Sequence, residues 1–483
     1  MADFSARTDK FIAFLQENDV TISPKLQIAD LRAANQGRGI IALEDIEIDE
    51  TLFTIPRTVL INSLNNSLVQ DQPELADKLA GLENEWDALI LVLLYEYKRK
   101  ESKWTDYFNV LPDLDTFEFH ELLFWNDEQL SDLKPSLVLD RIGKDKTVEM
   151  YERLVAIVNQ WNLEELKGMT MEEFTKIATI IMSYSFDVAQ GTEDEDEDED
   201  DEEEEEEVEY IKSMVPLADT LNADTHLNNA ILTYNKNQDL VMTCIKPIKK
   251  GEQVYNTYSD HPNCEILRRY GYVETTGSKY DFGEIPLTLI TSHFSKSLSE
   301  QLVFDLLEII TEISQEEQED DEPEVVAESY DCYSSKEVNL TFVFLIQLVT
   351  IIALIHKQEP ITADIQNITR IYKKCYQLVE SKKVTTEFVK NYTEILQARI
   401  NEYPPIAKEP YDKELKEPLR KSMAEVVLKS EYQSLSNCLD VDATLANTLD
   451  GSVKTIDDDK LIRNILKKRS NEDISSNAKR TKN

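Results

Sequence analysis

The residues best suited to chemistry in this chain are four tyrosines within one short stretch, EQVYNTYSDHPNCEILRRYGYVE, residues 252–274. Tyr255 and Tyr258 stand at the end of an expected strand, and Tyr270 and Tyr272 stand at the end of the expected helix that follows. A tyrosine in a core is usually a large apolar body whose hydroxyl finds a partner. Tyrosines brought together from a strand end and a helix end can instead line a narrow channel. The stretch alone leaves both interpretations open.

Three further segments hold residue types that suit a close approach to a ligand. NQGRG places Gly37 and Gly39 on either side of Arg38, which suggests backbone lying close to something. MSYSF, residues 182–186, precedes a long acidic run, and PLADTLNADTHLNNA, residues 216–230, follows that run. Taken singly, each motif is weak, because GRG is more often a turn and an asparagine often caps a helix or turn. Their order and joint spacing favour a functional interpretation.

In this order the four segments resemble a SET-domain protein-lysine methyltransferase. The class they resemble carries a helical insertion inside the SET domain and is related to the plant Rubisco large-subunit methyltransferase. SKWTDYFNVLP and LFWNDEQLSDLKPS are similar to insertion signatures of that class. The acidic run, and NAD where most relatives have Asn-His, look most like the fungal ribosomal lysine methyltransferases. The resemblance is strong over about residues 25–280 and weaker over the C-terminal third.

The implied reaction explains the residue types. S-adenosylmethionine would be the co-substrate, and its methyl group would pass in line to a lysine ε-amine. The amine must be neutral, although the pKa of a free lysine is about 10.4. An apolar channel lowers that pKa because it disfavours the cation. Holding the two reactants in line can itself contribute several kcal/mol, roughly 7–11 at best.

The resemblance also implies a role for individual residues. Tyr258 matches the catalytic tyrosine, and it also lines the substrate-lysine channel with Ser183, Phe186 and Asp219, the last through its backbone. Tyr184 stands where the plant relatives carry an arginine near the cofactor. The positions that match cofactor-binding residues are Gln36, Gly37, Arg38, Tyr184, Asn222, Ala223, Tyr270 and Tyr272. Gln36 and Arg38 are expected to act through their main chain.

The chain departs from the family pattern in two places. Ala223 replaces the usual histidine after Asn222, so one side-chain contribution at the cofactor is missing, and Asp224 is the nearest residue that could compensate. The stretch after YGY lacks the cysteine-rich, zinc-binding tail of the histone-methylating branch, which favours the non-histone branch. His261 and Cys264 have metal-like spacing, but two ligands from one loop make no site, so we expect no metal.

Charge narrows the choice of partner. With 94 acidic residues against 51 lysines and arginines, the net charge is −43 at pH 7. A sequence-independent nucleic-acid binder needs a basic surface, so direct nucleic-acid binding is not expected. Acidity often serves only solubility, but such a field also attracts a basic protein and raises its encounter rate. We therefore expect a basic protein substrate, with a ribosomal protein first.

Compartment and membrane signals are sparse. The five cysteines are scattered without a CxxC pair, which favours a reduced compartment. The most apolar run, Leu340–Ile355, would span roughly 24 Å as a helix, short of the roughly 30 Å of a bilayer core, so we expect a buried helix and no membrane span. Ser334 and Glu337 suggest a capping box in front of it. The basic tail, with Lys467–Arg469 and Lys479–Arg480, resembles a two-part nuclear-import signal, which predicts a nuclear protein with the cytoplasm as a second compartment.

The predicted fold is α+β: a split β-rich SET fold with a helical insertion, followed by an all-helical C-terminal substrate-binding domain. The predicted segments are 1–72, the N-terminal helix and first SET segment; 73–180, the helical insertion; 181–284, the second SET segment with a disordered acidic loop at 192–209; 285–460, the helical C-terminal domain; and 461–483, the basic tail. We expect a monomer.

The resulting functional prediction is S-adenosylmethionine-dependent methylation of a lysine in a large-subunit ribosomal protein. One alternative is the same chemistry on a histone or another nuclear protein. A second alternative is a non-catalytic acidic binding or assembly factor for basic proteins. Intact Tyr258, Asn222 and Ser183 speak against the second alternative, whereas only an assay separates the first.

Overall fold

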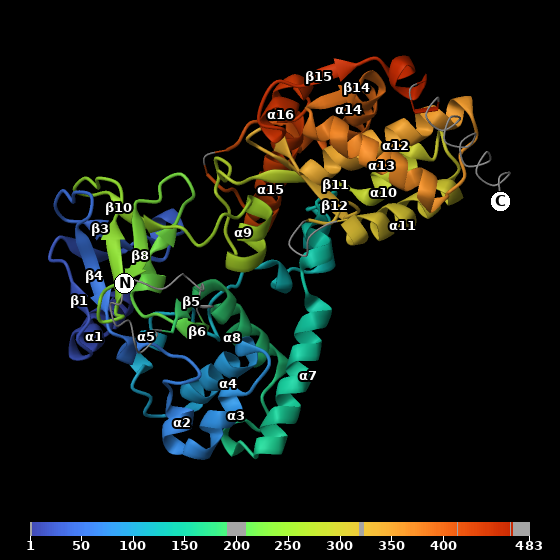
Figure 1. Ribbon diagram of the computed structural model, residues 1–483. Helices are drawn as coiled ribbons and strands as arrows, with labels where there is room; N and C mark the ends of the chain where they lie inside the picture. The colour runs from blue at the N-terminus through green and yellow to red at the C-terminus, as the bar shows by residue number, and fades with distance from the viewer. Residues whose placement is uncertain (1, 191–208, 318–322, 413, 464, 467–483) are drawn as a thin grey trace, which may run out of the picture. The chain divides into compact units, whose positions relative to one another are not determined.

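The structure, a computed structural model, describes residues 2–190, 209–317, 323–412, 414–463 and 465–466 (Figure 1). The acidic run Glu193–Glu207, residues 318–322 of a second acidic loop at 316–324, and the tail beyond Leu466 lie outside the described residues. The chain divides into two compact units. The first comprises Met1–Trp125, Asp140–His261 and Glu265–Tyr272, and the second comprises Asn126–Leu139, Pro262–Cys264 and Val273–Asn483. The domain limits drawn from the sequence stay a prediction.

The first unit contains two four-stranded sheets, and each combines strands from both ends of the split SET sequence. The first sheet has the order β1 (Thr21–Ile22), β4 (Thr51–Ile55), β9 (Leu240–Cys244) and β8 (Ala230–Tyr234). The second has the order β2 (Leu26–Asp30), β3 (Arg38–Ala42), β10 (Gln253–Asn256) and β7 (Asn222–Ala223). Figure 1 shows the blue strand β3 and the light green strand β10 side by side, and they pair antiparallel. The predicted split β-fold is confirmed.

Alternating burial explains why these segments form strands. In β9 the side chains of Leu240, Met242 and Cys244 are buried, while the two between them are half-buried, as expected for a strand with one face on a core. The polar stretch Asn235–Gln238, between two strand-like runs, predicts a turn, and this turn joins β8 to β9. Gln238 has φ +61° there.

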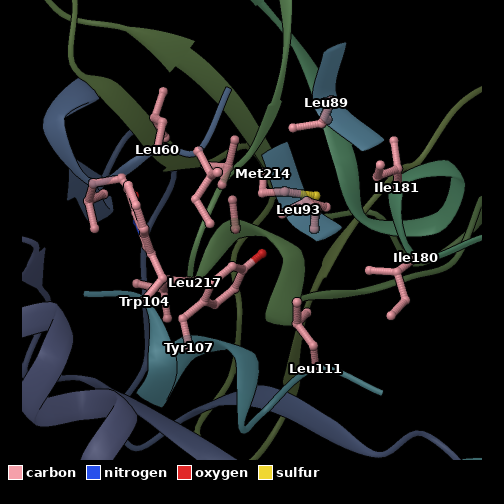
Figure 2. Packing of buried hydrophobic residues seen from close by; sticks show 14 of the residues in the cluster. Leu60, Leu89, Leu93, Trp104, Tyr107, Leu111, Ile180, Ile181, Met214 and Leu217 are labelled. Atoms are coloured by element: carbon pink, nitrogen blue, oxygen red, sulfur yellow. The ribbon is translucent and has the colours of Figure 1, made fainter. Parts of the chain in front are cut away.

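The N-terminal helix α1 (Ala2–Glu17) and helices of the insertion complete the first core. The insertion helices include α4 (Glu85–Lys98), α5 (Thr105–Phe108), α7 (Lys144–Trp161) and α8 (Met171–Tyr184). The helix α8 starts with a capping box made by Thr170 and Glu173, and it ends at Tyr184, immediately before β5 (Ser185–Ala189), which pairs with β6 (Tyr210–Met214). Figure 2 shows how buried side chains from several of these elements pack together: Leu89 and Leu93 of α4, Ile180 and Ile181 of α8, and Met214 of β6. This packing fixes the end of α8.

The second unit is mainly helical, as predicted. Its longer helices are α10 (Leu287–Phe294), α11 (Glu300–Glu317), α12 (Leu340–Gln358), α13 (Ile365–Glu380), α14 (Thr386–Ile400), α15 (Leu419–Asn437) and α16 (Val441–Thr448). The prediction left out short strands: β11 (Phe282–Pro286), β12 (Ser329–Tyr333) and β13 (Glu337–Val338) form one sheet, and β14 (Lys383–Thr385) pairs with β15 (Lys454–Ile456). Each of these sheets joins segments that are separated by a helix or an acidic loop, a pairing that local sequence does not encode.

The apolar run Leu340–Ile355 lies in α12. Among the described residues, α12 alone is long and apolar enough to cross a membrane by length and composition, and 72% of its most apolar window is buried inside the protein. The predicted capping box is wrong. The N-cap residue is Asn339, whose side chain caps no helical N–H, and Glu337 belongs to β13 instead. Glu337 pairs with Tyr333 in the sheet and therefore does not act as the third residue of a capping box.

Candidate active site

Three of the four tyrosines meet in the first unit. The ring centroid of Tyr258 lies 4.9 Å from that of Tyr270 and 6.3 Å from that of Tyr272, and the last two centroids are 6.4 Å apart. Tyr270 ends α9 (Asn263–Tyr270), and Gly271, with φ +70°, turns the chain back between the two rings. All three tyrosines are half-buried rather than enclosed, which favours a wall over a plain core.

A glycine at 271 is required for two reasons. Its positive φ is unfavourable for other residues, and an added Cβ would lie 3.0 Å from the Cδ atom of Glu121. The Glu121 segment therefore closes against the turn that brings Tyr272 next to Tyr258. The YGY spacing follows from this local geometry.

The hydroxyl of Tyr258 points to the backbone of the segment that holds Asn222. It donates a hydrogen bond to the carbonyl oxygen of Leu221 at 2.8 Å. Burial raises the pKa of Tyr258 well above its usual range, and neighbouring Tyr184 and Asp219 raise it further, so the hydroxyl stays protonated at neutral pH. Tyr255 faces elsewhere, because its hydroxyl oxygen accepts from Gln253 Nε2 at 2.7 Å.

Asn222 is held between two strands. Its Nδ2 donates to the carbonyl oxygen of Arg38 at 3.2 Å and to Gln253 Oε1 at 2.6 Å. Gln253 Nε2 in turn donates to Gln36 Oε1 at 3.0 Å. Gly39 lets these side chains come together, since an added Cβ would lie 2.5 Å from Gln253 Oε1 and 2.8 Å from Asn222 Nδ2. Gln253 and Gly39 are site residues that the motifs did not predict, although Gly39 belongs to the GRG segment.

The backbone around Gly37 is open. Gly37 has φ +61°, and no atom lies within 4 Å of the position that a Cβ would take. The side chain of Arg38 points away from this space: its guanidinium donates to Thr8 Oγ1 at 3.1 Å and lies 3.9 Å from the ring centroid of Phe4. Main chain rather than side chain therefore faces the opening, which fits the mode of cofactor contact predicted for these residues.

The residues predicted for the lysine channel come from two neighbouring elements. Ser183 Oγ, near the end of α8, donates to the carbonyl oxygen of Arg269 at 2.8 Å, and Phe186 lies in β5 opposite Ser213. Burial raises the pKa of Tyr184 well above its usual range, and Asp219 contributes to that rise. Since Asp219 raises the pKa of both Tyr184 and Tyr258, these three side chains lie close together.

Asp219 is itself buried. Its Oδ2 accepts a hydrogen bond from the hydroxyl of Tyr107 at 2.5 Å. Burial raises the pKa of Asp219 to about 7, although donated hydrogen bonds, that of Tyr107 first, lower it. The motifs did not predict Tyr107 as a site residue. The signal that could have indicated it is its position in SKWTDYFNVLP, the segment that resembles an insertion signature.

Two further predictions concern Asp224, as a substitute for the family histidine at Ala223, and the absence of a metal site. Asp224 Oδ1 accepts the backbone N–H groups of His226 and Leu227 at 2.9 and 2.8 Å, so its carboxylate stabilises a turn of its own. The structure gives no sign that it replaces the family histidine at Ala223. Within the described parts of the chain, no group of three or more His, Cys, Asp or Glu side chains could hold a metal ion.

Comparison with known proteins gives a family match and relatives. A model of the SET domain matches residues 37–259. The ribosomal lysine N-methyltransferase 4 of Saccharomyces cerevisiae is 40% identical over 499 residues, which cover 99% of this chain and 99% of the yeast protein. The human N-lysine methyltransferase SETD6 is 30% identical over 263 residues, which cover 52% of this chain and 51% of the human protein.

Solved structures agree on the fold. The SET domain of LSMT bound to lysine and AdoHcy has a TM-score of 0.62 at 18% identity, over 90% of this chain and 91% of that one. Rubisco LSMT bound to AdoMet has a TM-score of 0.59 at 18% identity, over 92% and 93% of the two chains. The sequence identity to the yeast enzyme extends over nearly the full length of both chains, and it shows the family as well as the fold. This chain belongs to the SET-domain protein-lysine N-methyltransferases, enzymes that take the methyl group from S-adenosylmethionine.

Proposed function

We propose that this enzyme methylates a lysine of a large-subunit ribosomal protein. The observation that carries the proposal is the 40% identity, over 99% of both chains, to a yeast protein named for ribosomal lysine methylation. Charge supports it, because a chain of net charge −43 attracts a basic protein, and ribosomal proteins are basic.

In this proposal Tyr258 orients the reacting amine without taking its proton. S-adenosylmethionine supplies the methyl group. The Tyr258 hydroxyl already donates its proton to the carbonyl oxygen of Leu221, so its lone pairs are left to accept from an amine N–H or a polarised methyl C–H. Its raised pKa argues against a base, because a tyrosinate would be rare at neutral pH.

The other predicted site residues form two groups, one that lines the lysine channel and one that holds the cofactor. Ser183, Phe186 and the backbone at Asp219 form the wall of the lysine channel with Tyr258, and excluding water there lowers the pKa of the substrate amine. The main chain at Gln36–Arg38, together with Asn222 and Ala223, forms the cradle for the cofactor. Aromatic faces attract a sulfonium cation, which is the role proposed for the remaining cofactor residues, Tyr184, Tyr270 and Tyr272.

A competition assay tests the substrate. The purified enzyme, given S-adenosylmethionine carrying a labelled methyl group, is offered large ribosomal subunits and core histones in separate reactions and then together. We expect label on one ribosomal protein and, by tandem mass spectrometry, on a lysine of that protein. Label confined to histones would reject the ribosomal substrate and support the histone alternative, and Tyr258→Phe serves as the inactive control in each reaction.

We also propose a nuclear location, on the strength of the basic tail. Leu461, Ile462 and Ile465 are buried in the core of the second unit, so a truncation that removes only the tail must come after Leu466. A fluorescent fusion ending at Leu466 should lose nuclear enrichment and keep its methyltransferase activity in vitro. An unchanged distribution would show that the tail does not direct import.

A further inference from the structure

A buried hydrogen bond links the helical insertion to the turn that precedes Asn222. The hydroxyl of Tyr107, in α5, donates to Asp219 Oδ2 at 2.5 Å across 112 positions of sequence. The Tyr107 side chain is fully buried, and Asp219 is 8% exposed. A carboxylate this far from water is retained only when donors surround it. The buried Asp219 carboxylate therefore needs the hydrogen bond that Tyr107 donates. The roles proposed above for methyl transfer do not involve the Tyr107 hydroxyl.

The carboxylate of Asp219 faces a strained turn. Leu217 has φ +84° and ψ −45°, a region that residues with a branched side chain rarely adopt. Besides the hydrogen bond from Tyr107, the backbone of Leu217 and the side chain of Thr220 lower the pKa of Asp219, so both lie close to its carboxylate. The hydrogen bond from Tyr107 ties the carboxylate of the 3₁₀ turn Ala218–Thr220 to α5, and strain of this kind persists only where surrounding contacts determine it.

The turn ends at the group that holds Tyr258. Leu221 follows Thr220 directly, and its carbonyl oxygen accepts the Tyr258 hydroxyl at 2.8 Å. A continuous chain of contacts thus runs from Tyr107 through Asp219 and the turn to Leu221 and Tyr258. A shift of the turn would move the carbonyl oxygen and leave the Tyr258 hydroxyl free to rotate.

Packing prevents Tyr107 from taking another position. Figure 2 shows its ring near Trp104, Leu111 and Leu217, with its hydroxyl oxygen directed away from Trp104. Trp104 is itself fixed, because its Nε1 donates to the carbonyl oxygen of Val59 at 2.8 Å. The ring of Tyr107 lies 5.6 Å from that of Phe108, centroid to centroid. The donor is therefore held rigidly where the Asp219 carboxylate needs it.

We propose that Tyr107 is a positioning residue for methyl transfer: through Asp219 it fixes the turn whose Leu221 carbonyl orients the Tyr258 hydroxyl. The inference rests on the role proposed above for Tyr258. It assigns a function in the reaction to a residue of the helical insertion that lies outside the SET strands. Tyr107 does not touch the reacting atoms, so its effect reaches them only through the turn.

Ionisation of Asp219 gives the proposal a distinctive signature. The titratable groups that face it are Tyr97 of α4, Tyr107 of α5, Tyr184 of α8 and Tyr258, and all four have raised pKa values and stay neutral near pH 7. An ionised carboxylate accepts hydrogen bonds more strongly than a neutral one, so the turn is held most firmly above the Asp219 pKa. Removing the Tyr107 donor raises that pKa and should move the dependent part of the rate profile to higher pH.

Tyr107→Phe tests this, with Tyr97→Phe as a matched control. Both tyrosines lie in neighbouring insertion helices, but the hydroxyl of Tyr97 is buried without a hydrogen-bond partner. Single-turnover transfer to large ribosomal subunits should slow about tenfold or more in Tyr107→Phe, because a turn that is no longer held misplaces the Tyr258 hydroxyl, and a misplacement of about 1 Å can cost on the order of a hundredfold. Its cofactor dissociation constant and KM should stay unchanged, its pH profile should move upward, and Tyr97→Phe should behave as wild type.

A Tyr107→Phe rate within twofold of wild type, or an equal loss in Tyr97→Phe, would overturn the inference. If Tyr107→Phe has no cooperative thermal transition, Asp219→Asn, which keeps the shape of the side chain, takes its place with the same expected loss and no such pH limb. The wild-type reaction separates the two proposals: an inactive wild type on ribosomal subunits rejects the substrate, whereas an active wild type beside an unaffected variant rejects only the role of Tyr107.

Discussion

Tyr258→Phe is expected to slow methyl transfer about a hundredfold, the usual cost of losing one oriented polar contact in a dry site. The change keeps the ring, and with it the contacts to Tyr270 and Tyr272 at 4.9 and 6.3 Å between centroids. It removes only the hydroxyl that Leu221 orients. Affinity for S-adenosylmethionine should change little, because the hydroxyl acts on the lysine side, and folding should survive the loss of one hydrogen bond.

Single-turnover kinetics beside a calorimetric titration of the same preparation measures both quantities. Tyr255→Phe is the informative companion, because Tyr255 lies three residues away in the same segment but its hydroxyl contacts Gln253 instead. Near-wild-type turnover in Tyr258→Phe together with a large loss in Tyr255→Phe would show that the catalytic hydroxyl had been assigned to the wrong tyrosine.

Gly37→Ala should weaken cofactor binding at least tenfold. If the cofactor lies against the main chain of Gly37, an added methyl group enters its space, and overpacking of this kind typically costs about 1–3 kcal/mol. In the protein without cofactor the same methyl group meets nothing within 4 Å, so its only cost is that of a positive φ, about 1–2 kcal/mol.

Gly168→Ala provides the matched control for this prediction. Gly168 also has a positive φ, +82°, and also has no atom within 4 Å of a built Cβ, but it lies in the turn before α8. The two variants should lose similar free energy of unfolding, and only Gly37→Ala should lose affinity for S-adenosylmethionine in calorimetry. Equal affinities in the two variants would remove Gly37 from the cofactor site.

Short sequence patterns predicted many of the helices and turns of the fold. The apolar run at Leu340–Ile355, the turn at Asn235–Gln238 and the helix before YGY all occur where the sequence placed them, because burial periodicity and turn chemistry act over a few residues. The capping box failed because Glu337 pairs with Tyr333 in a sheet. The C-terminal strands were missed for another reason, since β11 pairs with β12 and β14 with β15 across long stretches of sequence. Strand pairing between distant segments depends on tertiary contacts that no short window contains.

In the candidate site, too, the sequence predicts some features and tertiary packing decides the others. The order of motifs identified which residues gather, yet it could not tell that the side chain of Arg38 turns away to Thr8 and Phe4. Nor could it show that Tyr107 reaches Asp219 across 112 positions. Those facts depend on how the insertion helices pack against the turn before Asn222. Motif spacing predicts the participants, whereas packing decides the direction of each side chain.

The most direct test of the central claim is a comparison of lysine methylation in cells. Large ribosomal subunits are purified from cells that lack this protein and from the same cells carrying either the wild-type chain or Tyr258→Phe, and their proteins are compared by tandem mass spectrometry. We predict one or more ribosomal lysines that are methylated with the wild-type chain and unmethylated, or nearly so, in the other two strains. Identical ribosomal lysine methylation in all three strains would contradict the proposal.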